Sequence, residues 1–493
     1  MHKLISGPAS PSPATEPEPA PASLRPLCVD LDGSLVKSDT LVDSLLALLR
    51  THPGQAFKLP GRLFAGKAAF KAFVTESVTL DAAHLPYNAA LLHFLKQEHA
   101  RGRALYLATG ADEHLARRVA DHLGIFTSVL ASDGSTNLTG NNKLEGLRSR
   151  LDSAPFDYIG NDTPDLPLLA AATEAMVANP SLGLRMRLKA SGIRPVQVFQ
   201  DRKPFFRSLL KAARLQQWAK NLLIFMPLLL SHAVSTGKLL TALEAFLCFS
   251  LIASSAYILN DLLDMEADRS HPSKSLRPFA AGDLQGITGV LIAALFLALG
   301  MAGAQLLPAG FSAWLMIYLV TTVAYSLWLK RIALVDVLVL SLLYILRLLA
   351  GSAATLTVIS HWLAGFSMFL FLSLAIAKRF AELENLRVTN SVPRNGRGYL
   401  VTDLEQLRSF GTASAYAAVV VFAIYITGPD VMKLYRSPQL LLLSLPLMIL
   451  WLNRVWLLAS RGQLDEDPVA FALTDRMSLL IGAAVLAVAL LAL

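Results

Sequence analysis

Long apolar segments recur along the second half of the chain, whereas the first part alternates short apolar runs with polar segments. A helix needs about 20 mostly apolar residues to cross a bilayer. The apolar segments after residue 220 approach or reach that length, and they predict nine transmembrane helices. Their predicted bounds are 221–236, 238–260, 286–306, 310–328, 333–353, 361–380, 411–428, 437–457 and 475–493, and Pro227 interrupts the first of them.

The first part of the chain has the pattern of a soluble α/β domain over residues 26–200. Short apolar runs at Pro26–Val29, Ala104–Ala108 and Tyr158–Ile159 predict buried strands of a parallel sheet, and polar clusters follow them. Asp39–Glu98, between the first two runs, is predicted to be a helical cap. Residues 1–25 are rich in Pro, Ala, Ser and Glu and have no long apolar run, which predicts a disordered leader and not a signal peptide.

Composition supports a membrane protein. Of the 493 residues, 54% are hydrophobic and only 16% are charged, a balance too apolar for an ordinary soluble protein. The net charge of +8 first indicates cytoplasmic loops and anionic lipid, so we expect no nucleic-acid partner. The two cysteines, Cys28 and Cys248, fall in different predicted domains and imply neither a disulfide framework nor a cysteine zinc site.

Basic residues are distributed unevenly among the loops. Loops after the even-numbered predicted spans hold Arg269, Lys274, Arg277, Lys330, Arg331, Lys378, Arg379, Arg387, Arg394, Arg397, Arg408, Arg461 and Arg476. Loops after the odd-numbered spans hold only Lys238, Lys433 and Arg436. The positive-inside rule therefore predicts a multi-pass protein of the inner (plasma) membrane, with the soluble domain in the cytoplasm and, after nine spans, the C-terminus outside.

Two basic amphipathic segments lie outside the predicted spans. Residues 201–220 are predicted to form an interfacial linker helix whose bases face lipid headgroups. In the predicted cap, basic and apolar residues alternate in a similar way; they are Lys58, Arg62, Lys67 and Lys71 among Phe57, Leu63, Phe64 and Phe70. This cap segment is compatible with a membrane-surface helix and equally with an ordinary solvated helix face.

The first polar cluster of the soluble domain carries two carboxylates. Asp30 and Asp32 come directly after the first predicted strand, and Gly33 completes a tight turn. Carboxyl ends of parallel strands are where α/β domains bind ligands. One carboxylate there can act as a nucleophile and the other as an acid/base. An Asx-rich turn without catalytic function is the alternative interpretation.

Three further clusters follow along the same domain. Thr109 and Gly110, after the second strand, offer a hydroxyl and a backbone amide that can hold a phosphate. Lys143 supplies a cation for a transferring phosphoryl group. Asp162 and Asp165 lie at another strand end and suit Mg²⁺.

These four clusters, in this order, resemble the HAD superfamily of phosphohydrolases, and the likeness covers about Leu27–Gln200. The resemblance implies a Rossmann-like α/β fold in which Asp30 is the nucleophile and Asp32 the general acid/base. It also implies that Thr109, Gly110 and Lys143 bind phosphate. The implied Mg²⁺ site comprises Asp30, the Asp32 carbonyl and Asp162, supported by Asp165. A pseudo-enzyme of the same fold is the alternative, although no motif residue is missing.

The most informative stretch of the second half is Asn260–Gly282. Asp261, Asp264 and Asp268 are three and four residues apart, so on a helix their carboxylates share one face. A cation between them would relieve their repulsion, and oxygen ligands on an open face suit Mg²⁺ shared with substrate phosphates. Phosphate-binding donors follow at Arg269, Lys274 and Arg277. A solvated loop between membrane helices is the alternative.

Other polar residues lie near the predicted cytoplasmic ends of the spans, where ionisable groups are costly and usually functional. They are Lys220 and Asn221, Tyr325 and Lys330, Asp336, and Lys378, Arg379 and Glu382, with Arg347 deeper in the fifth span. Asp336 and Arg347 are about three helical turns apart and share a face, so they can serve the site or only neutralise each other. We expect one polar chamber that binds a diphosphate.

Nine spans, NDxxDxxxD at Asn260–Asp268 and YxxxxK at Tyr325–Lys330 resemble the UbiA superfamily of intramembrane prenyltransferases over about Leu210–Leu493. That superfamily normally has a second aspartate motif after the sixth span, where this chain has KRFAEL at Lys378–Leu383. This departure favours one branch, the decaprenyl-phosphate phosphoribosyltransferases, which feed the arabinose donor of actinobacterial cell walls. Segments similar to that branch are Gln217–Leu229, Asn260–Gly282, Leu342–Ala354, Ala377–Leu383 and Asp467–Arg476.

The resemblance implies that a polyprenyl phosphate attacks 5-phosphoribosyl 1-diphosphate and releases pyrophosphate, with Mg²⁺ as the cofactor. Asp261 and Asp264 would be the catalytic acids and, with Asp268, the metal ligands. Substrate contacts are assigned to Lys220, Asn260, Lys274, Arg277, Tyr325, Lys330, Asp336, Arg347, Lys378, Arg379 and Glu382. The soluble domain would remove the 5-phosphate from the lipid product. The alternatives are an aromatic prenyltransferase and a transporter or lipid-binding scaffold, and homo-oligomerisation stays open.

Overall fold

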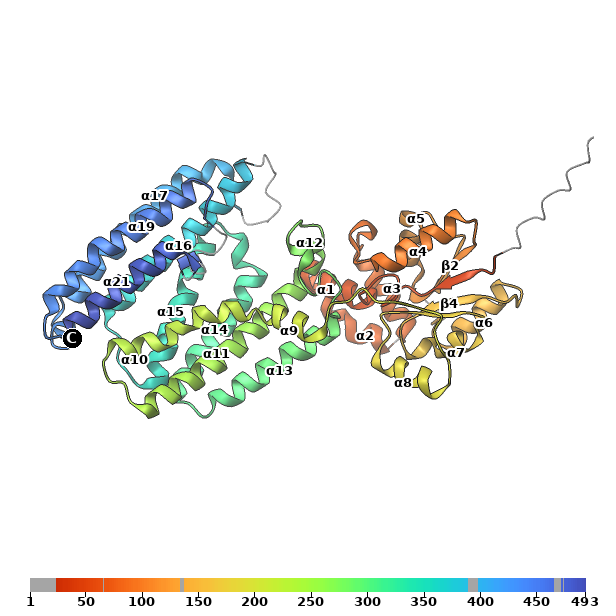
Figure 1. The fold of residues 1–493 in the computed structure, drawn as a ribbon, viewed down its shortest axis with the longest axis horizontal. Helices are drawn as coiled ribbons and strands as arrows, with labels where there is room; N and C mark the ends of the chain where they lie inside the picture. The colour runs from red at the N-terminus through yellow and green to blue at the C-terminus, as the bar shows by residue number, and fades with distance from the viewer. Residues whose placement is uncertain (1–23, 65, 134–136, 389–397, 465–470, 473) are drawn as a thin grey trace, which may run out of the picture. The chain divides into compact units, whose positions relative to one another are not determined.

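The computed structural model describes residues 24–64, 66–133, 137–388, 398–464, 471–472 and 474–493. The predicted leader therefore lies outside the described residues, except for Leu24 and Arg25. The chain divides into two compact units (Figure 1). The first comprises Met1–Leu48 and Gly54–Arg202, and the second comprises Leu49–Pro53 and Lys203–Leu493. Each unit is described by itself.

A six-stranded parallel sheet forms the centre of the first unit, in the order β3-β2-β1-β4-β5-β6. The strands are β1 (Leu27–Val29), β2 (Leu105–Asp112), β3 (Ser128–Ser132), β4 (Asp157–Gly160), β5 (Ala175–Ala178) and β6 (Gln197–Phe199). The central strand β1 pairs with β2 on one side and with β4 on the other. The polar residues after β1 and β4 and those within β2 therefore meet at one edge of the sheet.

Helices cover both faces of this sheet (Figure 1). They are α4 (Ala89–Ala100), α5 (Glu113–Leu123), α6 (Asn141–Arg150), α7 (Leu166–Ala171) and α8 (Leu182–Ala190). Neighbouring strand residues point to opposite faces, so Leu27 and Val29 belong to one buried cluster and Cys28 to another. The parallel α/β fold predicted for this part is thus confirmed.

The segment between β1 and β2 consists mainly of helices. It contains α1 (Thr40–Thr51), η1 (Pro53–Lys58), α2 (Leu59–Phe64), α3 (Lys67–Ser77) and η2 (Ala82–His84), followed by α4 of the core. Lys71 on α3 reaches the core, where its ammonium donates hydrogen bonds to the Gly110 carbonyl at 2.7 Å and to Asn137 Oδ1 at 2.8 Å. The inserted segment therefore contacts β2 itself and the residues after β3.

The second unit is helical throughout its described residues. Its helices are α9 (Phe205–Ala213), η4 (Leu215–Phe225), α10 (Met226–Leu230), α11 (Thr236–Leu263), α12 (Met265–Arg269), η5 (Lys274–Leu276), α13 (Gly286–Ala304), α14 (Ala309–Leu327), η6 (Leu329–Arg331), α15 (Val335–Thr355), α16 (His361–Val388), η7 (Val401–Asp403), α17 (Leu404–Ile426), α18 (Pro429–Met432), η8 (Pro438–Leu443), α19 (Ser444–Ser460) and α21 (Arg476–Ala492).

Seven segments among the described residues are long and apolar enough to cross a membrane, and α21 is a shorter apolar helix. The seven are α11, α13, α14, α15, α16, Val401–Ile426 and Pro438–Ser460. In α11, α15 and α16 more than half of the apolar window is buried inside the protein, against about a quarter in the other four. These three helices therefore form the packed centre of the unit.

The predicted count of nine spanning helices is not confirmed, because the segment predicted over 221–236 is not one α-helix. It falls on the end of the 3₁₀ helix η4, the short helix α10 and a turn. At about 2.0 Å per residue in a 3₁₀ helix and 1.5 Å in an α-helix, the 11 and 5 residues of η4 and α10 extend about 30 Å in total. This stretch, Leu215–Leu230, begins six residues before the predicted span and is not among the seven candidate spans.

Candidate active sites

The first candidate site lies at the carboxyl ends of β1, β2 and β4. Lys143, on α6, donates hydrogen bonds to Asp30 Oδ1 at 2.8 Å and to Asp165 Oδ1 at 3.0 Å. The Tyr158 hydroxyl donates to the same Asp165 oxygen at 2.8 Å. Asp30, Lys143, Tyr158 and Asp165 are all buried. The structure therefore brings residues from three separate sequence clusters into one hydrogen-bonded group, in which Lys143 lies between two carboxylates.

The two carboxyls of the DLDG turn differ in environment. Burial raises the pKa of Asp30 to about 6, although Lys143 opposes that shift. Burial, followed by the nearby Asp39 carboxylate, raises the pKa of Asp32 to about 8. The Thr40 amide donates to Asp32 Oδ1 at 2.8 Å and so fixes its orientation. At neutral pH this difference leaves Asp30 as the anion and Asp32 as the acid, which suits a nucleophile beside a proton donor.

Glycines at this edge leave room that a side chain would fill. Gly33 has φ +77°, and a Cβ there would lie 2.0 Å from Nδ2 of Asn161. A Cβ at Gly110 would lie 2.9 Å from Cγ2 of Thr139. Thr109 is fully buried, and its hydroxyl accepts a hydrogen bond from the Ala111 amide at 3.0 Å. The backbone can therefore approach a phosphate closely at both turns.

Asp162 follows β4 and is exposed, and its Oδ1 accepts hydrogen bonds from the Ser181 hydroxyl and the Thr163 amide, both at 2.7 Å. Asp165 Oδ2 accepts from the Asn161 and Asp162 amides, which orients the loop. Carboxylate and carbonyl oxygens of this kind are the donors Mg²⁺ prefers. The donor set of Asp30, Asp32 and Asp162 therefore fits that ion.

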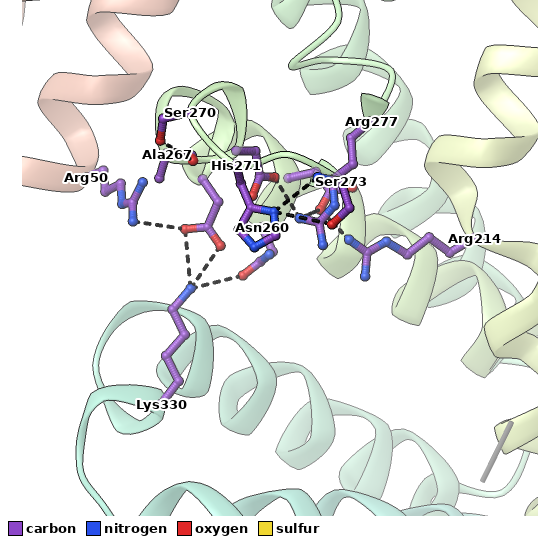
Figure 2. Close-up of polar contacts among 12 residues, drawn as sticks. Arg50, Arg214, Asn260, Ala267, Ser270, His271, Ser273, Arg277 and Lys330 are labelled. Atoms are coloured by element: carbon purple, nitrogen blue, oxygen red, sulfur yellow. Dashed lines mark hydrogen bonds and ion pairs between the residues drawn. The ribbon is translucent and has the colours of Figure 1, made fainter. Parts of the chain in front are cut away.

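The second candidate site surrounds the end of α11. The helical hydrogen bonds continue from Asn260 through Asp264 to Asp268, so the spacing of the aspartates is helical. The Arg277 guanidinium bridges two of them, at 3.2 Å from Asp261 Oδ1 and 2.6 Å from Asp268 Oδ2 (Figure 2). Asp264 instead pairs with Lys330 at 3.0 Å. The three carboxylates are therefore each paired with a base.

Lys330 connects the end of α14 with the end of α11. Its ammonium lies 3.4 Å from Asn260 Oδ1 in addition to its contact with Asp264 (Figure 2). Lys274 begins η5 nearby in the chain and is half-buried. Burial raises the pKa of Asp268 above its usual value, although Arg277 opposes the shift. Arg277 and Lys330 pair with the three aspartates in this structure. Phosphate oxygens of a substrate could replace the aspartates as partners of these two bases.

Sequence patterns did not place Arg214 in this site. The linker helix predicted for 201–220 ends earlier, because α9 stops at Ala213 and Arg214 has φ +52°. Its guanidinium pairs with Asp261 Oδ1 at 2.5 Å (Figure 2). It also lies 5.3 Å from the centroid of the Tyr257 ring. Among the bases of the linker, Arg214 thus faces the aspartates and not lipid headgroups. No signal in the sequence distinguished Arg214 from the other bases of the linker.

A second polar cluster joins α14, α15 and α16. Arg379 is 2% exposed and donates from Nε and Nη2 to the two oxygens of Asp336, which is fully buried. Nη2 also contacts the Tyr325 hydroxyl at 3.1 Å, and Nη1 lies 2.7 and 2.8 Å from the two oxygens of Glu382. All three guanidinium nitrogens of Arg379 therefore have hydrogen-bond partners. The adjacent Lys378 is half-buried on α16.

Arg347 does not neutralise Asp336, which was one interpretation of their spacing, since Asp336 pairs with Arg379. Arg347 donates to Asn221 Oδ1 at 2.8 Å, the Leu343 carbonyl at 2.5 Å and the Tyr318 hydroxyl at 3.3 Å. Its guanidinium also lies 5.0–5.5 Å from three ring centroids, those of Phe249, Tyr318 and Tyr344. Lys220 lies over the Tyr344 ring at 5.9 Å.

No group of three or more His, Cys, Asp or Glu residues is arranged as a metal cage within the part of the chain that the structure describes. The three aspartates at the end of α11 nevertheless offer hard oxygen donors on helical spacing, and two of them converge on one guanidinium. This donor set fits Mg²⁺ by its chemistry.

The two units define a protein that joins a parallel α/β domain to a multi-pass helical membrane domain with an acidic and basic site. The model of the UbiA prenyltransferase family matches residues 222–480. The chain belongs to the UbiA prenyltransferase family. It is therefore a multi-pass membrane protein, and its family membership indicates an enzyme.

Three relatives cover different shares of the chain. An uncharacterized protein from Sinorhizobium fredii is 36% identical over 460 residues, which is 93% of this chain and 89% of that protein. The nodulation protein NoeC from Azorhizobium caulinodans is 34% identical and covers 56% of this chain and 89% of that protein. A decaprenyl-phosphate phosphoribosyltransferase from Mycobacterium tuberculosis is 32% identical and covers 55% of this chain and 88% of that protein.

Two solved structures resemble one unit each. A UbiA homolog from Archaeoglobus fulgidus bound to GPP and Mg²⁺ is 18% identical over 57% of this chain and 99% of that chain, with a TM-score of 0.44. A HAD family hydrolase from Salmonella enterica serovar Typhi is 18% identical over 33% of this chain and 64% of that chain, with a TM-score of 0.25. At these TM-scores neither likeness bears on function.

Proposed function

We propose that the membrane unit transfers 5-phosphoribose from 5-phosphoribosyl 1-diphosphate to a polyprenyl phosphate and releases pyrophosphate. Two findings support this activity. A relative that is 32% identical is named decaprenyl-phosphate phosphoribosyltransferase. The end of α11 also combines three aspartates with Arg214, Arg277 and Lys330, which is the mixture of groups that a metal-bound diphosphate requires.

The choice of donor rests on the environment of Arg379. In the resemblance to prenyltransferases, a second aspartate motif near this position of the sixth predicted span would hold a second Mg²⁺. Here Arg379 pairs with both Asp336 and Glu382. Arg379 and Asp336 are 2% and 0% exposed, whereas the side chains of Arg277 and Lys330 are 27% and 18% exposed, so the acids at Arg379 are less accessible to a second metal ion than those at the end of α11. The membrane unit is then left with one aspartate cluster, which is enough to bind one metal-bound sugar diphosphate. A single cluster favours a sugar diphosphate as the donor over a prenyl diphosphate held by two metal clusters.

Asp261, Asp264 and Asp268 would hold Mg²⁺, which when bound neutralises charge on the leaving pyrophosphate. Arg277 and Lys330 exchange their carboxylate partners for phosphate oxygens when substrate binds. A phosphate oxygen of the acceptor attacks the anomeric carbon of the donor, the bond from that carbon to the diphosphate breaks, and pyrophosphate leaves with the bonding electron pair. The acceptor phosphate is already ionised at neutral pH, so the chain needs no general base for this step.

The first unit, in this proposal, removes the 5-phosphate from the lipid-linked product. The Asp30 carboxylate attacks phosphorus, and Asp32 gives its proton to the departing ribose oxygen. A water molecule, deprotonated by Asp32, then hydrolyses the aspartyl phosphate and releases inorganic phosphate. Lys143 balances charge beside Asp30 throughout, and Mg²⁺ held by Asp30 and Asp162 supplies further positive charge. The coupling places a phosphomonoesterase next to the phosphomonoester that its own chain makes.

The proposal includes sidedness. Both sites face the cytoplasm, because 5-phosphoribosyl 1-diphosphate is a water-soluble metabolite and the basic loops follow the same ends of the spans. With η4 and α10 as an extended first crossing and α21 as the last, the C-terminus is outside. Labelling a cysteine added after Leu493 in intact cells with an impermeant thiol reagent tests this arrangement, and its failure to react would refute it.

The function is tested by incubating purified full-length protein with labelled 5-phosphoribosyl 1-diphosphate and polyprenyl phosphate. We expect pyrophosphate release and a lipid whose mass corresponds to polyprenyl phosphoribose without its 5-phosphate. Asp261→Asn should abolish pyrophosphate release, whereas Asp430→Asn, an exposed aspartate elsewhere in the unit, should not. Asp30→Asn should leave the 5-phosphate on the lipid, whereas the exposed Asp121→Asn should not.

The same assay discriminates between the proposals. Prenylation of an aromatic acceptor from a prenyl diphosphate, with no use of 5-phosphoribosyl 1-diphosphate, would establish the aromatic prenyltransferase instead. A normal transfer reaction whose lipid product has the same phosphorylation state in Asp30→Asn and wild type would refute the coupling of the two units.

A further inference from the structure

Apolar side chains are exposed at the tip of the segment inserted between β1 and β2. We define the cap tip as residues 57–64, which include the last turn of η1 and all of α2. Phe57 is 89% exposed, Leu63 58% and Phe64 93%. None of the residues of α2 is buried. The phenyl rings of Phe57 and Phe64 are thus almost fully accessible to solvent in the first unit.

Exposed single apolar residues are ordinary, but three of them on one short helical tip form a patch. Two bases, Lys58 and Arg62, lie between them and are also exposed. Arg62 places its guanidinium 5.0 Å from the Phe73 ring centroid on α3. The tip is therefore attached to the rest of the first unit through Arg62 and through the partly buried Leu59, whereas its phenyl rings are not buried.

The charge around the tip has one sign. From residue 54 to residue 75 the sequence of the first unit has no Asp or Glu, whereas it has Lys58, Arg62, Lys67 and Lys71. A basic segment with exposed phenyl groups is complementary to the interface of an anionic bilayer, where the rings enter the acyl boundary and the bases stay at the headgroups. The second unit keeps the chain at such a bilayer permanently.

We propose that the cap tip inserts Phe57 and Phe64 into the anionic lipid surface, and that this docking presents lipid-linked phosphomonoesters to the site at Asp30. The second part of the proposal rests on the proposed function of the first unit. The cap that docks is also the cap that contacts the site, because Lys71 holds the Gly110 carbonyl at 2.7 Å. In this proposal the cap therefore contacts both the membrane and Gly110, one of the residues assigned to phosphate binding.

The docking is tested by a fluorescent probe in the full-length protein. The cysteine of the Phe64→Cys variant is labelled with an environment-sensitive nitrobenzoxadiazole group. The labelled protein is placed in nanodiscs of phosphatidylcholine alone or of phosphatidylcholine mixed with phosphatidylglycerol. The two native cysteines, Cys28 and Cys248, are buried, and burial raises the pKa of the Cys28 thiol to about 12, so labelling is selective. The matched control carries the same probe at the exposed position Ala100→Cys.

We expect the probe at position 64 to emit at shorter wavelength with phosphatidylglycerol and to be quenched by spin-labelled lipid, while the probe at position 100 changes in neither respect. Adding Lys58→Gln and Arg62→Gln should remove the dependence on phosphatidylglycerol. Equal emission in both nanodiscs with no lipid quenching would overturn the proposal. A blue shift that depends on protein concentration and not on lipid would instead assign the tip to contact with a second copy.

A kinetic experiment tests the consequence for catalysis. Burying one phenyl side chain is equivalent to about a tenfold change in equilibrium constant or more. The double variant Phe57→Ser/Phe64→Ser should therefore lower kcat/KM for lipid-linked phosphoribose in vesicles by at least about tenfold, and leave hydrolysis of soluble ribose 5-phosphate unchanged. Leu182→Ser, which changes an apolar residue of α8 that is 77% exposed, is the matched control.

The outcomes separate this proposal from the proposed function. If wild-type protein does not hydrolyse the lipid substrate, the function assigned to the first unit is refuted, while the probe at position 64 still decides whether the tip docks. If the lipid substrate is hydrolysed equally by wild type and by the double variant, the docking role is refuted and the phosphatase function stands.

Discussion

Arg379 provides the sharpest test of how the membrane unit is organised. Its guanidinium and the Asp336 carboxylate are 2% and 0% exposed, and the pair also engages Tyr325 and Glu382. Replacing Arg379 by Gln removes the cation but leaves Asp336 buried among three helices. Breaking a buried ion pair in this way costs about 3–5 kcal/mol, because the remaining charge is uncompensated. We therefore expect Arg379→Gln to lower the unfolding temperature of the protein in nanodiscs by several degrees.

The double variant Asp336→Asn/Arg379→Gln separates charge from shape. Both side chains are then neutral and can still hydrogen-bond, so the unfolding free energy should recover by up to about 3 kcal/mol relative to the sum of the single changes. Circular dichroism melting of the four proteins completes the double-mutant cycle. Arg461→Gln, which changes an exposed arginine directly after α19, is the control and should change stability by less than about 0.5 kcal/mol.

Two results would contradict this reasoning. If Arg379→Gln is as stable as wild type but raises KM for 5-phosphoribosyl 1-diphosphate, Arg379 is a direct phosphate ligand, as its sequence position first indicated. If the two single changes are additive in the double variant, the pair contributes no coupling and the cluster does not hold α15 and α16 together. Recovery of stability without recovery of activity would agree with a positioning role.

Further predictions concern the two sites. Lys143→Met leaves two buried carboxylates unpaired, so we expect loss of phosphate release and a lower melting temperature, while pyrophosphate release in the membrane unit stays near wild type. Gly33→Ala should abolish phosphate release too, because its φ of +77° and its contact with Asn161 exclude a Cβ. Arg277→Gln should reduce kcat/KM for pyrophosphate release by about tenfold or more, as expected for a charged phosphate contact. EDTA should stop both reactions and excess Mg²⁺ should restore them, and activity that persists in EDTA would exclude metal ions from the sites.

The first unit could be predicted well from sequence because its chemistry follows the ends of its strands. Parallel strands place their carboxyl ends at one edge, so Asp30, Thr109 and Asp162 had to be neighbours once β1, β2 and β4 were adjacent. The contact of Lys143 with Asp30 and Asp165 could not be derived in the same way, because it depends on the position of α6. The hydrogen bond from Lys71 to the Gly110 carbonyl could not be predicted either, because it depends on the position of α3.

The membrane unit was less predictable because helical spacing gives the face of a residue but not its partner. Asp336 and Arg347 share a face of α15, yet Asp336 pairs with Arg379 from α16. Packing between helices decides such pairs, and hydropathy contains no information about it. Arg214 was assigned to the lipid surface for the same reason, since its charge was visible in the sequence while its contact with Asp261 was not.

The close packing of η4 against α15 is another contact that the sequence did not reveal. Gly351 on α15 lets the chain of η4 approach so closely that a Cβ there would lie 2.1 Å from the Ile224 carbonyl. At this close crossing Asn221 of η4 accepts a hydrogen bond from Arg347, and its amide donates to the Ser250 hydroxyl on α11. A buried cation needs polar partners inside a membrane, and the 3₁₀ helix η4 supplies one of them. Asn221, at the start of the first apolar segment, therefore has a packing reason: it joins η4 to α11 and α15.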